Sequence, residues 1–478
     1  KQLKIRGFRI ELGEIESIVN KIQGVKESVV LAKEEDFSKK LLLYFTKDTT
    51  ENILVNKNLS SQNHVDSWSD IFDSSYSKQE TNEEFDIGIW NSSYTGEAIS
   101  NDEMLDWVES TVNLILKQNP KNIFEIGCGT GLLLYRLHQR CQSYYGIDIS
   151  SKIIDNLVHS IDNKNIENVF LDCSTASDFL IPNDLQVDTV VINSVIQYFP
   201  NITYLHSVIE KAIDSISSQK GSLIIGDVRN YALHEEFKFS ILNSQKENSL
   251  SLPEIITMIK RNTNKEDELL IHPEYFINLK NSLANISDVH ISLKEENNKN
   301  EMTSYRYDVV IDINKNIHES TPSNFSYQTF EYDTNDNLKS LTDIINNTEG
   351  IFKIESVPNS RIFKEKNAKE LNKLIELDYH NLESIMTEED NQINPSDVYT
   401  LVQSLNCEYN ISWSKKGAKY FDILINKTNT KVSLSPSSNN EISDINIYAN
   451  NPMIKNDDSI VINEIKSELS KRLPEYMI

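Results

Sequence analysis

The chain has 478 residues, and its 47 lysines and arginines stand against 72 aspartates and glutamates, for a formal net charge of −25. This balance argues against nucleic acid or an anionic membrane as a partner, because both require clustered positive charge. No apolar run approaches the ~18 residues of a membrane span and no signal peptide is visible, so we expect a soluble, cytoplasmic protein. The length predicts two to four domains.

The cysteine and histidine patterns favour reduced thiols and no bound metal. The four cysteines lie far apart without a CxxC pair, which argues against disulfides. The nine histidines form no HxxxH or HExxH pattern. We therefore predict no metal site.

The first 50 residues read as one small α+β segment. Two short strands flank Gly7, a helix follows in GEIESIVNKIQ, and ESVVLAKEE and KLLLYFTKD alternate as a hairpin. Residues 51–84 are polar and rich in Asn, Ser, Asp and Glu. We interpret 51–84 as a linker.

Residues 85–315 alternate between helical and strand-like patterns. A helix in MLDWVESTVNLIL precedes the strand NIFEI, and further strands follow in YYGIDIS, VFLDCS, VDTVVINS, GSLIIGDV and YRYDVVIDI. This alternation predicts an α/β domain with a doubly wound, mostly parallel, Rossmann-like sheet.

The last third of the chain is less regular. For residues 316–455 we expect an appended α+β subdomain, with a helix at 367–377 and strands in EYNISWS and YFDILIN. An amphipathic helix at 459–472 belongs to a final segment, 456–478, which ends in LPEYMI.

The segment NIFEIGCGTGLL carries the clearest functional signal. Glycine is scarce, at 13 residues, against a usual frequency of ~7%. Yet Gly127, Gly129 and Gly131 fall together between a strand-like and a helix-like run. Such a loop lets the backbone approach a nucleotide closely and directs helix N–H groups at it.

Two residues narrow the choice of ligand. Glu125 precedes the loop, where its carboxylate suits a cationic amino-acid group and would repel a pyrophosphate. Leu132 stands where a dinucleotide fingerprint has a third Gly or Ala, which disfavours an NAD-dependent oxidoreductase. The pattern E-x-G-x-G-x-G resembles the first motif of S-adenosylmethionine-dependent methyltransferases, so we expect cofactor contacts from Glu125, Gly127, Cys128, Gly129 and Gly131.

Acidic and hydroxyl residues after the next two strands are candidates for the adenosine part of that cofactor. Asp148 ends the second strand, where a carboxylate can accept hydrogen bonds from ribose hydroxyls; a helix N-cap is the alternative. Ser177 and Asp178 follow the third strand and are expected near the adenine edge, with helix capping as the alternative.

The fourth strand leads into NSVIQYFP. Ligands bind at the carboxyl ends of such strands, so Asn193, Ser194, Gln197 and Tyr198 should border the reacting centre. Asn193 and Ser194 are also expected to contact the cofactor, and Asn193 and Tyr198 are candidate catalytic residues.

Two aromatic residues precede the glycine loop in WNSSYTG. The faces of Trp90 and Tyr94 could stabilise a sulfonium by cation–π attraction, worth ~0.5–2 kcal/mol. Both could equally be ordinary core residues.

Methyl transfer is a direct displacement, so most of the rate gain should come from orientation. A carboxylate could orient an acceptor amine and collect its proton, and Glu301 and Asp227 are the candidates. The alternative is that these carboxylates form ion pairs with Arg229 or Arg306.

Motifs at the two ends resemble one known family. KIRGFRIELGEIE, at 4–16, and LPEYMI, at 473–478, resemble the two ends of the C-terminal subdomain of nonribosomal peptide synthetase adenylation domains. Between them, FEIGCGTG, NSVIQYFP, GDVRNYALHEEF and NEMTSYRYDVV resemble the N-methyltransferase domains embedded in interrupted adenylation domains. His272 stands where that family has an Asp.

The resemblance implies methyl transfer from S-adenosylmethionine to the α-amine of an aminoacyl thioester on a carrier-protein phosphopantetheine arm. It also implies an N-terminal adenylation subdomain as partner, and it admits an MbtH-like helper protein. Adenylation is not expected from this fragment alone, since the ATP-binding subdomain is missing from it and its second part, 456–478, is truncated. Two alternatives stay open: O- or C-methylation of the same tethered substrate, and a non-catalytic docking module.

Overall fold

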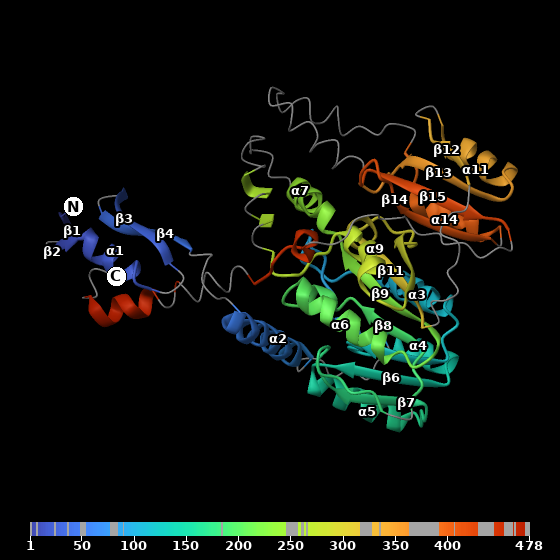
Figure 1. Ribbon diagram of the computed structural model, residues 1–478, viewed down its shortest axis with the longest axis horizontal. Helices are drawn as coiled ribbons and strands as arrows, with labels where there is room; N and C mark the ends of the chain where they lie inside the picture. Colours follow the sequence, from blue (N-terminus) through green and yellow to red (C-terminus); the bar gives the residue numbers. More distant parts are fainter. Residues whose placement is uncertain are drawn as a thin grey trace. The chain divides into compact units, whose positions relative to one another are not determined.

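The computed structural model describes residues 2–5, 8–22, 25–35, 38–47, 54–76, 85–88, 90–182, 185–244, 257–259, 262–263, 266–315, 327–333, 336–362, 392–405, 407–428, 444–453, 462 and 465–473. The chain forms two compact units. One comprises Lys1–His64 with Pro452–Ile478, and the other comprises Val65–Asn451 (Figure 1).

The first unit joins the two ends of the chain. Its strands pair antiparallel, β1 with β2 and β3 with β4. Its elements are β1 (Gln2–Ile5), β2 (Phe8–Glu11), α1 (Leu12–Val19), β3 (Val25–Glu35) and β4 (Ser38–Lys47). These elements confirm the two strands, helix and hairpin predicted for this segment.

The core of this unit draws on both ends of the sequence. Ile465, Leu469 and Leu473 are buried with side chains of α1 and β3. Ile465 and Leu469 lie in a helical stretch, 465–472, within the predicted helix at 459–472. Of the segment LPEYMI, only Leu473 is among the described residues.

A seven-stranded sheet forms the centre of the second unit. Its order is β10-β11-β9-β8-β5-β6-β7, with parallel pairing from β9 to β7 and antiparallel pairing of β11 with both β9 and β10. The strands are β5 (Asn122–Ile126), β6 (Ser143–Asp148), β7 (Val169–Cys173), β8 (Thr189–Asn193), β9 (Lys220–Arg229), β10 (Ile286–Leu293) and β11 (Arg306–Asn314). The doubly wound, mostly parallel sheet is confirmed, and β10 is an additional strand.

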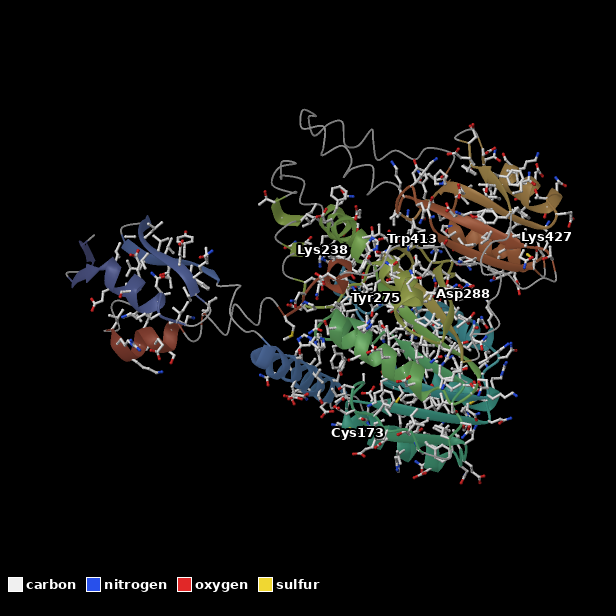
Figure 2. The ribbon with its side chains drawn as sticks, in the orientation of Figure 1. Cys173, Lys238, Tyr275, Asp288, Trp413 and Lys427 are labelled. Carbon is white, nitrogen blue, oxygen red and sulfur yellow. The ribbon has the colours of Figure 1, made fainter. Side chains whose placement is uncertain are left out.

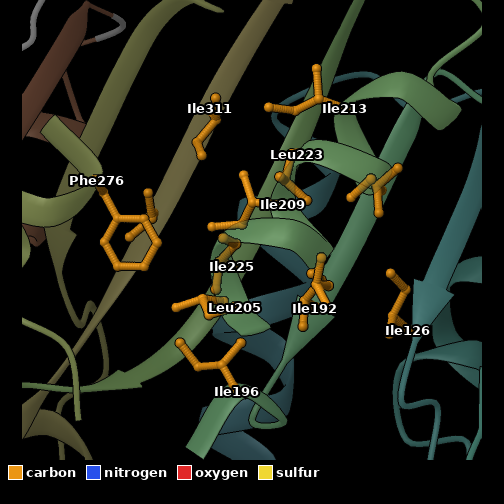
Figure 3. Close-up of a cluster of buried hydrophobic side chains, with 14 of the residues drawn as sticks. Ile126, Ile192, Ile196, Leu205, Ile209, Ile213, Leu223, Ile225, Phe276 and Ile311 are labelled. Atoms are coloured by element: carbon orange, nitrogen blue, oxygen red, sulfur yellow. The ribbon is translucent and has the colours of Figure 1, made fainter. Parts of the chain in front are cut away.

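Helices cover both faces of this sheet because its central strands are apolar on both sides. Phe124 and Ile126 belong to the buried cluster on the side of α6 (Ile202–Ser215) and α9 (Pro273–Ser282). Figure 3 draws part of this cluster, including Ile126 of β5, Ile209 of α6 and Phe276 of α9. Ile123 instead packs with α3 (Asn101–Leu116) and α4 (Leu134–Leu137). Successive residues of β5 therefore serve opposite layers.

His272, at the position of a family Asp, is the N-cap of α9. Its Nδ1 accepts the Glu274 N–H at 3.2 Å. An imidazole acceptor can cap a helix as a carboxylate does, so the departure from the family pattern leaves this helix start intact.

A helix, α2 (Leu54–Tyr76), occupies most of the stretch interpreted as a linker. Most of its residues are polar, so its sequence shows no clear helical spacing of apolar residues. Trp68 and Phe72, four residues apart, stack on each other with ring centroids 5.7 Å apart and both contact Tyr198. Tertiary packing of these two aromatic side chains stabilises the helix where its sequence periodicity is weak.

The appended subdomain has its own four-stranded sheet, in the order β12-β13-β15-β14. The predicted strands in EYNISWS and YFDILIN are confirmed as β14 (Glu408–Trp413) and β15 (Tyr420–Asn426). The other elements are β12 (Gln328–Glu331), α11 (Leu338–Asn347), β13 (Ile351–Pro358) and α14 (Pro395–Gln403). The helix predicted at 367–377 lies outside the described residues.

Arg361 links this subdomain to the domain built on the seven-stranded sheet. Its side chain is 2% exposed and donates to the backbone oxygens of Lys294 (2.8 Å), Glu296 (2.8 Å) and Thr303 (3.1 Å). These carbonyls belong to the segment that runs from the end of β10 into α10 (Glu301–Tyr305). A single guanidinium therefore fixes the path of that segment.

Among the helices that the structure describes, none combines the length and the apolar character needed to span a membrane.

Arg361→Ala should destabilise the second unit by about 2–4 kcal/mol, because it leaves several buried carbonyls without donors. Thermal unfolding followed by circular dichroism measures this, and Arg140→Ala, at an exposed arginine, is the control. Equal melting temperatures for the two variants would contradict the role of Arg361 as a fastener.

Candidate active site

A cavity lies where the strand order reverses, at the carboxyl ends of β5 and β8. Such a switch point is the usual ligand site of an open α/β sheet. We call it the cofactor cavity. The predicted residues that line it are Trp90, Glu125, Gly127, Cys128, Gly129, Asp148, Asn193, Ser194 and Tyr198.

The glycines of the loop after β5 adopt left-handed backbone conformations. Gly127, Gly129 and Gly131 have φ values of 80°, 49° and 83°. A Cβ on Gly127 would lie 2.3 Å from Cγ2 of Val195. Gly131 does not line the cofactor cavity, and a Cβ there would lie 2.9 Å from Cδ2 of Leu157. The absence of a side chain at Gly131 therefore allows close packing against α5 (Ser151–Asn163).

Asp148, at the end of β6, holds the glycine loop. Its Oδ2 accepts the Gly129 N–H at 2.8 Å, and its Oδ1 accepts the Ser150 N–H at 3.0 Å. Burial raises the pKa of this carboxyl. The cap of α5 is Ser150, whose hydroxyl accepts the Ile153 N–H, so Asp148 is not the N-cap. Its carboxylate oxygens can accept further hydrogen bonds.

Glu125 lines the same cavity from near the carboxyl end of β5. Its side chain is 3% exposed and accepts a hydrogen bond from the Tyr144 hydroxyl. Burial raises the pKa of Glu125 to about 8. A cationic group placed against this carboxyl would favour its charged form and lower that pKa.

Asn193 offers a second acceptor to a cationic group. Its Oδ1 is buried in the cavity wall and has no hydrogen-bond partner among the described residues. A Cβ on Gly226 would lie 2.1 Å from this oxygen, so the glycine leaves room for it. Buried acceptors are normally satisfied, and both Asn193 and Glu125 offer oxygen acceptors that suit the ammonium of S-adenosylmethionine.

The adenine contacts predicted for Ser177 and Asp178 do not match their positions. The cofactor cavity is lined instead by Ser174, Thr175 and Ala176, directly after β7. The Ser177 hydroxyl accepts from Tyr204 at 3.2 Å, and the Asp178 carboxylate accepts from Thr175 at 2.7 Å. Both side chains therefore take part in a local hydrogen-bonded turn, which is closer to the capping role given as the alternative than to an adenine contact.

The two aromatic candidates have different surroundings. Trp90 lines the cofactor cavity and packs at a tilt against Trp107, with ring centroids 5.0 Å apart. Tyr94 lines neither the cofactor cavity nor a second cavity that adjoins it. Its hydroxyl bonds the Ser240 hydroxyl at 3.0 Å and its ring meets the edge of Phe237, so Tyr94 is a packing residue.

Sequence reasoning missed the aromatic side chains of α2. Val65, Trp68 and Phe72 line the cofactor cavity, and the Trp68 ring lies 4.6 Å from that of Tyr198. The four-residue spacing of Trp68 and Phe72 is a helical signal that the polar composition of this stretch obscured.

A second cavity, of about 400 Å³, adjoins the first. We call it the acceptor cavity. The two share Trp90 and Tyr198, so these side chains stand where the cavities meet. Burial raises the pKa of Tyr198 to about 12, which keeps its phenol neutral. The polar residues lining the acceptor cavity include Ser93, Gln197, Arg229, His234, Lys238, Glu266, Glu268, Glu301 and Arg306.

Glu301 is held at the start of α10 by Ser93. Its oxygens accept the Ser93 N–H at 2.8 Å and the Ser93 hydroxyl at 2.9 Å, and the side chain is 6% exposed. Within the described part of the chain, no lysine or arginine forms an ion pair with it. Arg306 pairs with Asp227, and Arg229 pairs with Glu266 and Glu268.

The position of Asp227 does not support the predicted role of collecting a proton from the acceptor. Asp227 is fully buried and lines neither cavity. It accepts from the Trp107 indole at 3.1 Å and the Ser194 hydroxyl at 2.9 Å, and it pairs with Arg306. Asp227 is therefore a positioning residue. Its ion pair with Arg306 is the alternative role given for it from the sequence.

A charged wall closes the acceptor cavity beside α7 (His234–Ser244). Glu266 lies 3.1 Å from Arg229 and 2.9 Å from Lys238, which Figure 2 labels on α7. Arg229 and Lys238 hold the pKa of Glu266 below its usual range against the effect of burial. The charges of this wall are thus compensated by one another.

Cofactor binding should release protons because the raised pKa of Glu125 falls when an ammonium binds beside it. Below pH 8 the free protein carries this proton, so affinity for S-adenosylhomocysteine should rise with pH, by up to about tenfold per unit between pH 6 and 7.5. Calorimetry in buffers of different ionisation enthalpy should detect close to one released proton at pH 7.

Glu125→Gln should abolish this proton release, whereas Glu210→Gln, at a half-exposed residue of α6, should keep it. Release that persists in Glu125→Gln would show that another group titrates.

The site agrees with comparisons to known proteins. Residues 117–276 match a family model described as a methyltransferase domain. The chain is 35% identical over 323 residues to chondramide synthase cmdD of Chondromyces crocatus, covering 65% of this chain and 8% of that protein. It is 25% identical over 501 residues to nonribosomal peptide synthetase asqK of Emericella nidulans, covering 100% of this chain and 19% of that protein. The chain thus spans a small part of these relatives.

Among solved structures, the N-methyltransferase NodS from Bradyrhizobium japonicum WM9 aligns with 45% of this chain and 98% of its own, at 14% identity and a TM-score of 0.29. Such a likeness is too low to carry weight, so the fold assignment rests on the strand order and the family match. Residues 117–276 therefore match a methyltransferase domain, within a chain whose relatives include proteins named as nonribosomal peptide synthetases.

Proposed function

We propose that this chain transfers a methyl group from S-adenosylmethionine to the α-amine of an aminoacyl thioester on a carrier protein. The observation that carries the proposal is the meeting of the cofactor and acceptor cavities at Trp90 and Tyr198. The relatives named as nonribosomal peptide synthetases support a carrier protein as the partner that delivers the acceptor.

Different residues of the cofactor cavity are proposed to bind different groups of S-adenosylmethionine. Asp148 is the proposed ribose acceptor, and Glu125 and Asn193 are the proposed acceptors for the ammonium. S-adenosylmethionine, when bound, supplies a methyl group activated by a sulfonium. The ring of Trp90, which packs at a tilt against Trp107, can stabilise that positive charge by cation–π attraction of ~0.5–2 kcal/mol.

Orientation of the acceptor amine is the proposed task of Glu301. An α-amine has a pKa of ~8, so a useful neutral fraction exists near pH 7–8 without a strong base. Glu301 lines the acceptor cavity and is fixed through both oxygens by Ser93. It can accept a hydrogen bond from the amine and collect the proton released on transfer. The neutral Tyr198 phenol borders the same space and can donate or accept one hydrogen bond.

The direct test is the position of the added methyl group. Aminoacyl groups loaded on the cognate carrier protein and incubated with labelled S-adenosylmethionine should carry the label on the α-nitrogen, as located by fragment mass spectrometry. Label on a side-chain oxygen or carbon would support the alternative activity on the same substrate. Cofactor binding without transfer to any loaded amine would favour a docking module.

Glu301→Gln should lower kcat by about 10²–10⁴-fold if the carboxylate accepts the proton, with a smaller effect on KM. Single-turnover rates on loaded carrier protein measure the change. Glu97→Gln, at an exposed residue of the same loop as Ser93, is the matched control. A Glu301→Gln rate within threefold of the wild type would mean that orientation by other groups suffices.

A further inference from the structure

His234 has a chemically unusual place in the acceptor cavity. It begins α7, lines the cavity and is 2% exposed. Neither of its ring nitrogens has a hydrogen-bond partner among the described residues. Its Nε2 lies 3.6 Å from a Glu266 oxygen, beyond hydrogen-bond distance.

The imidazole of His234 is neutral in the physiological range. Burial lowers its pKa to about 4, and Lys238 and Arg229 act in the same direction against Glu266 and Glu235. A neutral imidazole carries one N–H donor and one nitrogen acceptor. It is therefore equipped to bind a group that can both donate and accept.

Gln197 presents a matching unsatisfied atom to the same cavity. Its Nε2 donates to the backbone oxygen of Ser194 at 2.9 Å and to the Ser194 hydroxyl at 3.0 Å, which fixes the orientation of the amide. Its Oε1 is buried and has no partner within the described ranges. Buried polar atoms are rarely left unsatisfied, so a bound molecule or water should meet them.

The charges around these two residues favour a neutral ligand. Arg229, Lys238, Glu266 and Glu268 compensate one another within the wall. A charged ligand group would have to compete with these pairs, whereas a neutral one would leave them intact. An amide carries its donor and its acceptor on separate atoms and can engage both an imidazole N–H and a glutamine carbonyl.

We propose that His234 and Gln197 recognise a neutral amide of the acceptor, as specificity-determining residues of the acceptor cavity. The inference rests on the proposed methyl transfer to a carrier-tethered amine. The amide has two possible sources with the same chemistry: the pantetheine arm, which contains secondary amides, or the side chain of the amino acid itself.

Four acceptors separate these sources. Leucyl and asparaginyl thioesters are made with N-acetylcysteamine, which keeps one arm amide, and with butanethiol, which has none. His234→Leu should lower kcat/KM by about tenfold for acceptors that carry the recognised amide and leave the leucyl butanethioester unchanged. If kcat/KM falls only for the N-acetylcysteamine thioesters, the recognised amide belongs to the pantetheine arm. If it falls only for the asparaginyl thioesters, the recognised amide is the amino-acid side chain.

Matched variants distinguish recognition from damage to the fold. His234→Asn keeps a donor and an acceptor and should retain the discrimination within about threefold, and His159→Leu, on the exposed side of α5, should behave as the wild type. Affinity for S-adenosylhomocysteine should not change, since His234 does not line the cofactor cavity.

An equal loss for all four acceptors, or no loss for any, would overturn the recognition role. If the wild type binds S-adenosylhomocysteine but methylates none of the four acceptors, and no carrier-loaded amine either, the proposed function fails instead.

Discussion

The buried carboxylate of Asp227 is the interaction on which the geometry of both cavities depends. It receives the Trp107 indole and the Ser194 hydroxyl from the cofactor side, and it pairs with Arg306 of the acceptor side. Its own backbone N–H donates to Asp308 at 2.8 Å, and its φ of 63° is uncommon for a residue with a side chain. Removing one partner of such a buried charge network strongly destabilises a protein. The network therefore fixes the position of the two cavities relative to each other.

For the proposed methyl transfer, this arrangement supplies alignment rather than a strong base. Displacement at a methyl group needs alignment above all, and Trp90 and Tyr198 stand where the two cavities meet. The acceptor side adds a carboxylate, Glu301, held by Ser93 rather than by a cation. The appended subdomain contributes through Arg361, which fixes the segment leading to Glu301.

Features encoded over short stretches of sequence were predictable. The glycine loop after β5 has the expected backbone, and Asp148 and Asn193 line the cavity they were assigned to. Features that depend on distant contacts were not. Trp68 reaches the cavity only because polar α2 packs there, and the two carboxylates Asp227 and Glu301 look alike in sequence although only Glu301 lines a cavity. Ion pairing with Arg306 distinguishes them, and that requires the fold.

A crystal structure with S-adenosylhomocysteine and a non-hydrolysable aminoacyl-pantetheine amide would test the central claim, that the two cavities form one reaction path. We expect the sulfur in the cofactor cavity and the acceptor nitrogen beyond Trp90 and Tyr198, in line and within about 3–3.5 Å of the position of the methyl carbon. An acceptor nitrogen bound outside the cavity lined by Glu301, or separated from the sulfur by an intact protein wall, would contradict it.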